Sequence, residues 1–243
     1  RLDRSTAIAI ARRAVELGVT FIDTADAYDL GDNEELLAEA LHPYRETTEF
    51  WAGLGRDLAA LHMRSVGERF GWHRDGWLGL LPQVNTWTDD GNDFFAQFRL
   101  LRYLAEPRAL EVLTERDRRA LERLCSRLPE LLPEARPVLT HGDLWAGNVL
   151  ATVEGTPALV DPAVSYCLPE ADLSMLWCTR RPPASDAFFA AYSEVLPLEP
   201  GWQDRMRLLH LRELLCTLAH AGDVEGALDR TRDILAPFRP TTP

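Results

Sequence analysis

Residues 140–161, THGDLWAGNVLATVEGTPALVD, hold the most informative pattern in the chain. Two carboxylates and a carboxamide, Asp143, Asn148 and Asp161, stand five and thirteen residues apart, each beside an apolar run. Phosphoryl transfer from ATP needs a carboxylate that orients the attacking hydroxyl, and oxygen ligands that hold magnesium. The pattern predicts Asp143 as the catalytic base, with Asn148 and Asp161 as the metal ligands.

The apolar runs around these residues predict short strands. Val138 and Leu139 form a buried strand that leads into the HGD turn, and residues 148–151 and 157–160 form two strands that join at Glu154–Gly155. The resulting hairpin would bring its two ends together. We therefore expect the carboxamide at its start and the carboxylate after its end to be neighbours.

The same spacing occurs in the catalytic loop of protein kinases, where HRD is followed by four residues, an Asn, and later a metal-binding Asp. An alternative without function remains for each residue. HGD can be an ordinary turn, Asn148 a cap at a strand edge, and Asp161-Pro162 the end of a strand.

Composition limits the classes of function. With 243 residues, 46% hydrophobic and 26% charged, the chain suits one or two globular domains. The net charge of -12 argues against nucleic acid or anionic membrane as partners. Four cysteines without a CxxC pair indicate neither a zinc site nor disulfides: Cys125, Cys167, Cys178 and Cys216.

Location and basic residues add two further expectations. The chain contains no apolar run long enough to span a membrane and no secretory pattern at its start, so we expect a cytoplasmic protein. All 26 basic residues are arginine. Because arginine replaces a catalytic lysine poorly, any mechanism must proceed without a lysine from these residues.

The N-terminal part, residues 1–46, predicts an α-β-α fragment with helices over 5–17 and 33–41 and a strand over 19–22. The segment AVELGVTFIDTADAYDLGDNEELLAEAL resembles the start of the aldo-keto reductases. The resemblance implies that Asp23 and Tyr28 match two members of their catalytic tetrad. Without the later strands and a lysine the tetrad is incomplete, so we interpret both residues as relics.

The remaining chain predicts mostly helices. Residues 50–62 and 93–128 have helical periodicity, as do 186–195 and 203–220, and Asp172 lies in the first turn of a helix that begins near Pro169. A loop-rich stretch between the first two contains Trp72, Trp77 and Trp87, which serve equally well as a substrate wall or as core residues.

Residues 48–222 closely resemble the C-terminal lobe of the fructosamine kinase family, relatives of the aminoglycoside phosphotransferases with a protein-kinase-like fold. The resemblance rests on FWAGLGRDLAALH, GERFGWHRDGWLGLLPQVNTWTDD, LTHGDLWAGNVL, DPAVSYCLPEADLSML and AFFAAYSEVLPLEPGW. It implies an α+β, predominantly helical fold in which residues 47–240 form the catalytic lobe and carry a short β-hairpin.

The resemblance also implies a reaction, namely ATP- and Mg²⁺-dependent phosphorylation of a sugar hydroxyl on a ketosamine, either a small molecule or bound to a protein. Asp143 matches the base, and Asn148 and Asp161 match the magnesium ligands. Trp145 and Trp87 are expected to contact substrate. His141 and Asp172 are expected to be structural, His141 by bracing the loop and Asp172 by capping a helix.

Two departures from the family pattern affect these expectations. VSYCLPEADLSML replaces a motif like YYGHREADLAML after DPA, and residues 1–46 contain neither a glycine-rich phosphate loop nor a lysine in place of the N-terminal kinase lobe. We therefore expect a fusion or truncation with weak activity or none by itself. An exposed lobe face would favour self-association.

Three hypotheses follow. The chain is a ketosamine kinase with an intact catalytic loop and an impaired nucleotide lobe, or an inactive remnant that binds a sugar-amine or a protein. The third, which we rank last, is an aldo-keto reductase that uses Asp23 and Tyr28. Magnesium-dependent ATP binding, ketosamine binding without ATP, and NADPH oxidation distinguish them.

Overall fold

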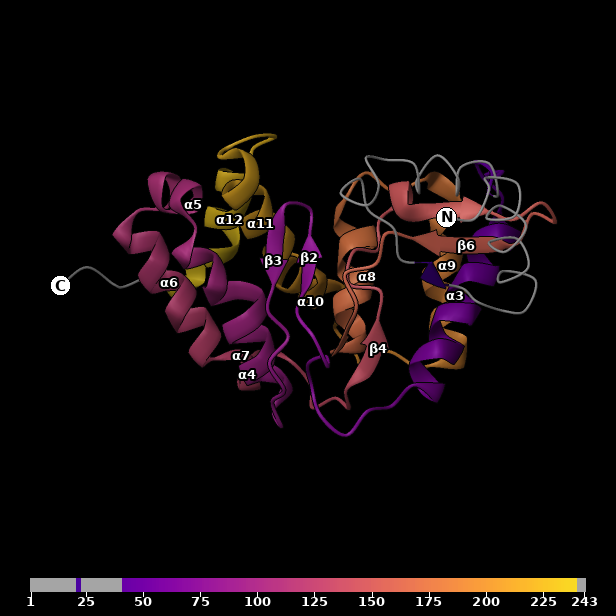
Figure 1. Ribbon diagram of the computed structural model, residues 1–243, viewed down its shortest axis with the longest axis horizontal. Coiled ribbons are helices and arrows are strands. Elements are labelled where there is room, and N and C mark those ends of the chain that lie inside the picture. Colours follow the sequence, from indigo (N-terminus) through magenta and orange to yellow (C-terminus); the bar gives the residue numbers. More distant parts are fainter. Residues whose placement is uncertain (1–20, 23–40, 240–243) are drawn as a thin grey trace, which may run out of the picture. The chain divides into compact units, whose positions relative to one another are not determined.

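The computed structural model describes residues 21–22 and 41–239, which form two compact units (Figure 1). The described residues of the first unit are 21–22, 41–64, 141–162 and 179–198, and those of the second are 65–140, 163–178 and 199–239. Residues 41–46 share a unit with 47–64. Most of the predicted N-terminal fragment lies outside the described residues, so its boundary at residue 46 stays a prediction.

The first unit combines a small sheet with two packed helices. Its elements are β1 (Phe21–Ile22), α3 (Thr48–Arg64), the 3-10 turn Ala146–Asn148, β5 (Val149–Ala151), β6 (Pro157–Val160), the 3-10 turn Pro183–Ser185 and α9 (Asp186–Val195). The strands lie in the order β1-β6-β5. β5 and β6 are antiparallel, whereas β1 runs parallel to β6.

The predicted hairpin of residues 148–160 is confirmed, with one correction at its start. Val149 pairs with Leu159, and Gly155 adopts a φ of 82° at the turn, a conformation that glycine reaches without steric cost. Asn148, predicted as a strand residue, instead ends a 3-10 turn. The predicted strand over 19–22 is confirmed for Phe21–Ile22, the only part of it that the structure describes.

α3 and α9 lie side by side in the first unit (Figure 1). The helical periodicity predicted over residues 50–62 is confirmed by α3, in which Phe50, Leu54 and Leu58 are buried, whereas Leu61, predicted on the same face, is partly exposed. Gly55 lies at the contact between the two helices. A Cβ atom built on it would lie 2.2 Å from the backbone oxygen of Phe188 in α9. The close approach of the two helices therefore depends on glycine at position 55.

Gly55→Ala is expected to lower the free energy of unfolding by about 2 kcal/mol, as other overpacking substitutions do. The added methyl group would meet helix backbone, which moves less easily than a side chain. Gly53→Ala in the same helix is the control, because its Cβ atom would have no neighbour closer than 3.9 Å. Urea unfolding of both variants measures the difference, and equal stability of the two would contradict this account.

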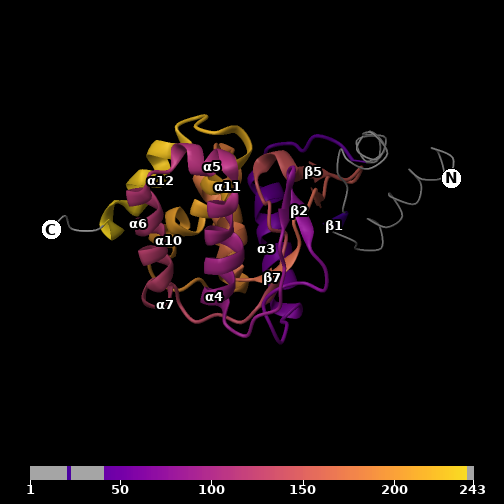
Figure 2. The ribbon, with the colours of Figure 1, turned by 60° about the vertical axis from the view of Figure 1, so that its left-hand side comes forward.

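The second unit is mainly helical. Its elements are β2 (Gly76–Leu78), β3 (Leu81–Gln83), α4 (Gly91–Phe95), a π-helical turn (Ala96–Leu100), a 3-10 helix (Leu101–Ala105), α5 (Pro107–Val112), α6 (Glu115–Ser126), α7 (Leu128–Leu131), β4 (Val138–Thr140), β7 (Ser165–Cys167), α8 (Pro169–Cys178), α10 (Trp202–Leu209), α11 (Leu211–Ala221), α12 (Ala227–Leu235) and a final 3-10 turn (Ala236–Phe238). In Figure 2, α5, α6, α11 and α12 gather at one end of this unit.

The strands of the second unit form two separate pairs. β2 and β3 make one antiparallel hairpin, and β4 pairs with β7 in antiparallel register, Leu139 opposite Tyr166. The predicted strand at Val138–Leu139 is thus confirmed, but its partner β7 was not predicted. The three-residue β7 follows a loop, and its alternation is too short to stand out by pattern.

Several predicted helices are confirmed with changes. α8 begins at Pro169 and α9 spans residues 186–195 as predicted. The predicted helix over 203–220 is two helices, because α10 ends at Leu209 and α11 begins at Leu211. The helical stretch 93–128 is likewise divided, since Pro107 starts a new helix and Thr114 caps another with its side chain.

A buried arginine joins the helical part of the second unit to its strands. Arg99 Nη2 donates to Asn85 Oδ1 at 2.6 Å and to Ser165 Oγ at 2.9 Å, and Nη1 donates to the carbonyls of Val84 and Phe98. Burial lowers the pKa of Arg99 to about 10, so the group stays charged at neutral pH. These bonds compensate the cost of burying the charge.

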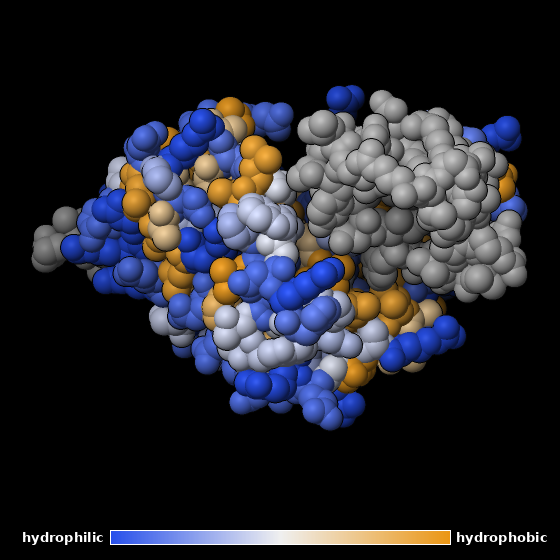
Figure 3. Space-filling view, viewed as in Figure 1, coloured by the Kyte–Doolittle hydropathy of each residue, from blue (hydrophilic) through white to orange (hydrophobic). Residues whose placement is uncertain are grey.

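The surface of the described residues is mixed. On the face in Figure 3 hydrophobic residues are scattered among hydrophilic ones, as is usual for the surface of a globular protein. None of the described helices combines the length and the apolar composition that crossing a membrane requires.

Candidate active site

The HGD turn after β4 is held by a buried histidine. His141 Nδ1 accepts a hydrogen bond from the backbone N–H of Asp143 at 3.2 Å, and its Nε2 lies 2.9 Å from the carbonyl of Val160. With Nδ1 as the acceptor, Nε2 carries the proton and donates to the carbonyl. The ring thus connects the HGD turn to the end of β6. This is the geometry expected of a bracing residue, and the role itself stays a prediction.

Asp143 and Asn148 are in direct contact. The side-chain Nδ2 of Asn148 donates to Asp143 Oδ2 at 2.9 Å and to the Asp143 carbonyl at 2.8 Å. Asn148 is only 7% exposed, and its backbone N–H donates to the carbonyl of Trp145, which closes the 3-10 turn. A spacing of five residues thus becomes a hydrogen-bonded pair because the chain between them turns back on itself.

Asp161 follows β6 directly and has an unusual backbone. Its φ is 55°, in the left-handed region that non-glycine residues seldom adopt. The pairing of Val149 with Leu159 places Asn148 and Asp161 at the same end of the hairpin, as the sequence predicted. Asp161 is exposed, and backbone strain of this kind is concentrated at functional sites.

Trp145 covers the catalytic loop from outside. Its side chain is 42% exposed, and a Cβ atom built on Gly147 would come within 2.3 Å of its ring. The glycine therefore allows the indole to approach the backbone of residue 147 closely. A half-exposed aromatic face is suitable for contact with a sugar ring.

The other predicted site residues are distributed as follows. Trp87 and Asp172 belong to the second unit; Trp87 is 37% exposed with its ring 6.1 Å from that of Tyr166, and Asp172 is buried in the first turn of α8. Asp23 and Tyr28 lie outside the described residues. The structure therefore gathers His141, Asp143, Trp145, Asn148 and Asp161 in one unit.

The oxygen atoms in this unit fit a magnesium ion by type. Magnesium prefers one or two carboxylates together with amide or water oxygens. Because Asn148 uses its amide nitrogen for both bonds to Asp143, its amide oxygen is the atom suited to a cation. Among the residues that the structure describes, no cluster of three or more His, Cys, Asp or Glu could hold a metal. Asp143, Asn148 and Asp161 fall outside this criterion, because asparagine is not among those four residue types.

Sequence reasoning missed the residues that hold the segment after Asp161-Pro162. Gln83 Nε2 donates to the Ala163 carbonyl at 2.9 Å, and Arg99 contacts Ser165. Gln83 in turn accepts a bond from Arg212 Nη2 at 2.8 Å. The signal was present: Gln83 and Asn85 stand two apart, so they share one face of an extended segment among apolar neighbours.

Comparison with known proteins gives one consistent family. A model of the fructosamine kinase family matches residues 24–231. A probable ketoamine kinase of Synechocystis sp. is 37% identical over 180 residues, covering 74% of this chain and 60% of its own length. The chain spans about half to three fifths of the length of the first curated relatives that it matches.

Solved structures agree in fold. A "putative fructosamine-3-kinase" from Thermobifida fusca superimposes with a TM-score of 0.72 at 35% identity, covering 80% of this chain and 67% of the other. A choline kinase from Streptococcus pneumoniae, with 16% identity, a TM-score of 0.54 and 97% and 81% coverage, shares the protein-kinase-like fold alone. None of these matches supports the aldo-keto reductase resemblance. The match to the fructosamine kinase model begins at residue 24, inside the segment on which that resemblance rests.

Proposed function

The chain belongs to the fructosamine kinase family, and we propose that it carries the catalytic half of an ATP-dependent ketosamine kinase. The observation that supports this most is the contact of Asp143 with Asn148 at the end of the hairpin that leads into Asp161. A base and its metal ligands must be neighbours, and the contact of Asp143 with Asn148 together with the register of the hairpin supports this arrangement.

The reaction is transfer of the terminal phosphoryl group of ATP to a sugar hydroxyl. The hydroxyl oxygen forms a bond to the γ-phosphorus, the bond from this phosphorus to the bridging oxygen breaks, and ADP leaves. Asp143 orients the hydroxyl and takes its proton as that bond forms. Asn148 holds the carboxylate of Asp143 in place by donating to Oδ2.

Magnesium, when bound, neutralises the charge that develops on the phosphate oxygens. The residues suited to hold it are Asn148, through its amide oxygen, and Asp161. His141 connects the two halves of this arrangement, because it bonds both the backbone of Asp143 and the carbonyl that precedes Asp161. Positioning of this kind contributes a large share of the rate in phosphoryl transfer.

The acceptor that we propose is a ketosamine, in which a sugar is joined to an amine that is free or on a protein. The neighbour from Thermobifida fusca is named a "putative fructosamine-3-kinase", and the hydroxyl at position 3 is our first choice here. Trp145 offers an exposed aromatic face for the sugar ring.

The described site contains no residue that we can assign to holding the ATP phosphates. The resemblance to the family implies a lysine for this contact, and these 243 residues contain no lysine. Arginine or backbone N–H groups would have to replace it, with less adaptable geometry. We therefore expect slow turnover from these residues alone, and a second candidate function is binding of a sugar-amine without turnover.

One experiment tests the proposal directly. The protein is incubated with Mg-ATP and fructosyl-lysine, and phosphorylated product is measured by mass spectrometry under single-turnover conditions, with sorbitol as the acceptor without an amine. We expect product from fructosyl-lysine only. No product, together with tryptophan fluorescence quenching by fructosyl-lysine in the absence of ATP, would replace the kinase with the binding function.

A further inference from the structure

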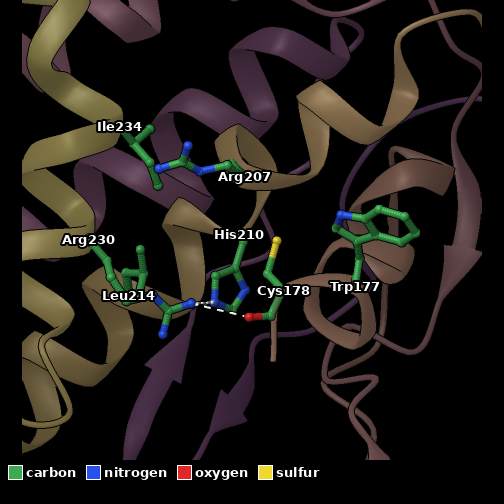
Figure 4. A pocket seen from close by; sticks show the side chains of 7 residues that line it. All are labelled: Trp177, Cys178, Arg207, His210, Leu214, Arg230 and Ile234. Atoms are coloured by element: carbon green, nitrogen blue, oxygen red, sulfur yellow. Dashed lines mark hydrogen bonds between the residues drawn. The ribbon is translucent and has the colours of Figure 1, made fainter. Parts of the chain in front are cut away.

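A pocket lies in the helical part of the second unit, formed by α8, α10, α11 and α12 (Figure 4). Its volume is about 270 Å³, near the lower end of the range for small-molecule pockets, roughly 300 to 1,000 Å³. All its lining residues belong to one unit, and none of them is a predicted site residue.

Two arginines line this pocket without a carboxylate partner. Arg207 projects from α10 and Arg230 from α12, and among the described residues neither guanidinium forms an ion pair. Other arginines of this strongly acidic chain do, as the pair of Arg205 with Glu170 shows. Two uncompensated positive charges at one pocket attract an anion.

The orientation of Arg230 is fixed by the wall of the pocket. Its Nη2 donates to the carbonyl of Cys178 at 3.3 Å and lies 3.0 Å from Nε2 of His210, as Figure 4 shows. Only one of its three nitrogens takes part in these bonds, so the Nε and Nη1 hydrogens remain for a ligand. A guanidinium held in this way loses little side-chain entropy on binding.

His210 adds an incomplete polar group. Since arginine only donates, Nε2 of His210 accepts, and the proton of the neutral ring is on Nδ1. Burial, and next the charge of Arg230, lowers the pKa of His210 to about 4, so the ring is neutral at pH 7. His210 is 96% buried, and its Nδ1 has no hydrogen-bond partner among the described residues. A ligand oxygen in the pocket would provide one.

From these residues we infer that the pocket binds the phosphate group of a small phosphate ester. A phosphate presents several oxygens to donors that approach from different helices, whereas a carboxylate presents two in one plane. Trp177, Leu214 and Ile234 supply an apolar wall for the rest of the ligand. The site is separate from the proposed kinase residues and does not depend on that function.

The test is titration calorimetry of the full chain with inorganic phosphate and with glucose 6-phosphate, without magnesium, and with acetate as the carboxylate. Arg207→Gln and Arg230→Gln are expected to weaken binding of both phosphate probes by about tenfold or more, the loss typical of a charge-assisted bond. Arg123→Gln is the matched control, because Arg123 is exposed on α6, outside the pocket. This substitution changes the net charge by the same amount as the other two.

Alkylation of Cys178 by iodoacetamide provides an independent measurement. Cys178 lines the pocket, whereas the other three cysteines of the chain are buried. Inorganic phosphate is expected to slow alkylation of Cys178 in the parent protein and in Arg123→Gln, but not in Arg207→Gln, which lacks one of the two guanidinium groups at the pocket. No phosphate binding, equal weakening by all three substitutions, or acetate binding as tight as phosphate would each overturn the assignment.

Discussion

Asp143→Asn is expected to reduce phosphorylation of a ketosamine by about 10²- to 10⁴-fold, the usual contribution of a positioned general base. The substitution preserves size and leaves an oxygen that can accept the bond from Nδ2 of Asn148, so the loop should keep its shape. The loss is expected in the single-turnover rate constant, measured by quenched-flow assay, and not in the affinity for Mg-ATP.

The control for this substitution is Glu154→Gln, which removes one negative charge from the exposed turn of the same hairpin. Its rate should equal that of the parent protein. A rate in Asp143→Asn within a factor of about three of the control, a difference far smaller than a general base supplies, would remove the base role from Asp143.

Asp161→Asn is expected to abolish the stabilisation by Mg-ATP, which amounts to about 2.7 kcal/mol when the ligand is at about 100 times its Kd. Asparagine tolerates the left-handed conformation, so this variant removes the charge without changing the backbone. Differential scanning fluorimetry with and without Mg-ATP measures the effect. Removal of magnesium from the parent protein by chelation should have the same result.

Asp161→Gly separates the ligand role from backbone strain. Glycine adopts a φ of 55° without steric cost, so this variant should melt at or above the temperature of the parent protein without nucleotide, while it also loses the response to Mg-ATP. A response to Mg-ATP that persists in both variants would show that the nucleotide binds without this carboxylate.

Local chemistry made part of the site predictable. The turn at Glu154–Gly155, the apolar runs on either side of it and the helix start at Pro169 are recognisable because each depends on residues close in sequence. The hairpin of residues 148–160 followed from these signals. Its register then placed Asn148 and Asp161 at one end, which no property of either residue alone would indicate.

Other features depended on contacts between distant residues. The division of a predicted helix at His210 and the pairing of β4 with β7 arise where segments far apart in the chain meet, and pattern alone carries no information on such partners. The same holds for position 55, which requires glycine because the backbone of Phe188 in α9 lies close to it in the packed pair of helices.

The sequence by itself determined which chemical groups this protein has for catalysis: the spacing of Asp143, Asn148 and Asp161, and a complement of basic residues that is entirely arginine. Only the tertiary structure decided how such groups are used. Arg99 is buried and hydrogen-bonded to Asn85, whereas Arg230 lines the pocket that we assign to an anion. The two differ because burial and partners, not residue type, set the free energy of a charge.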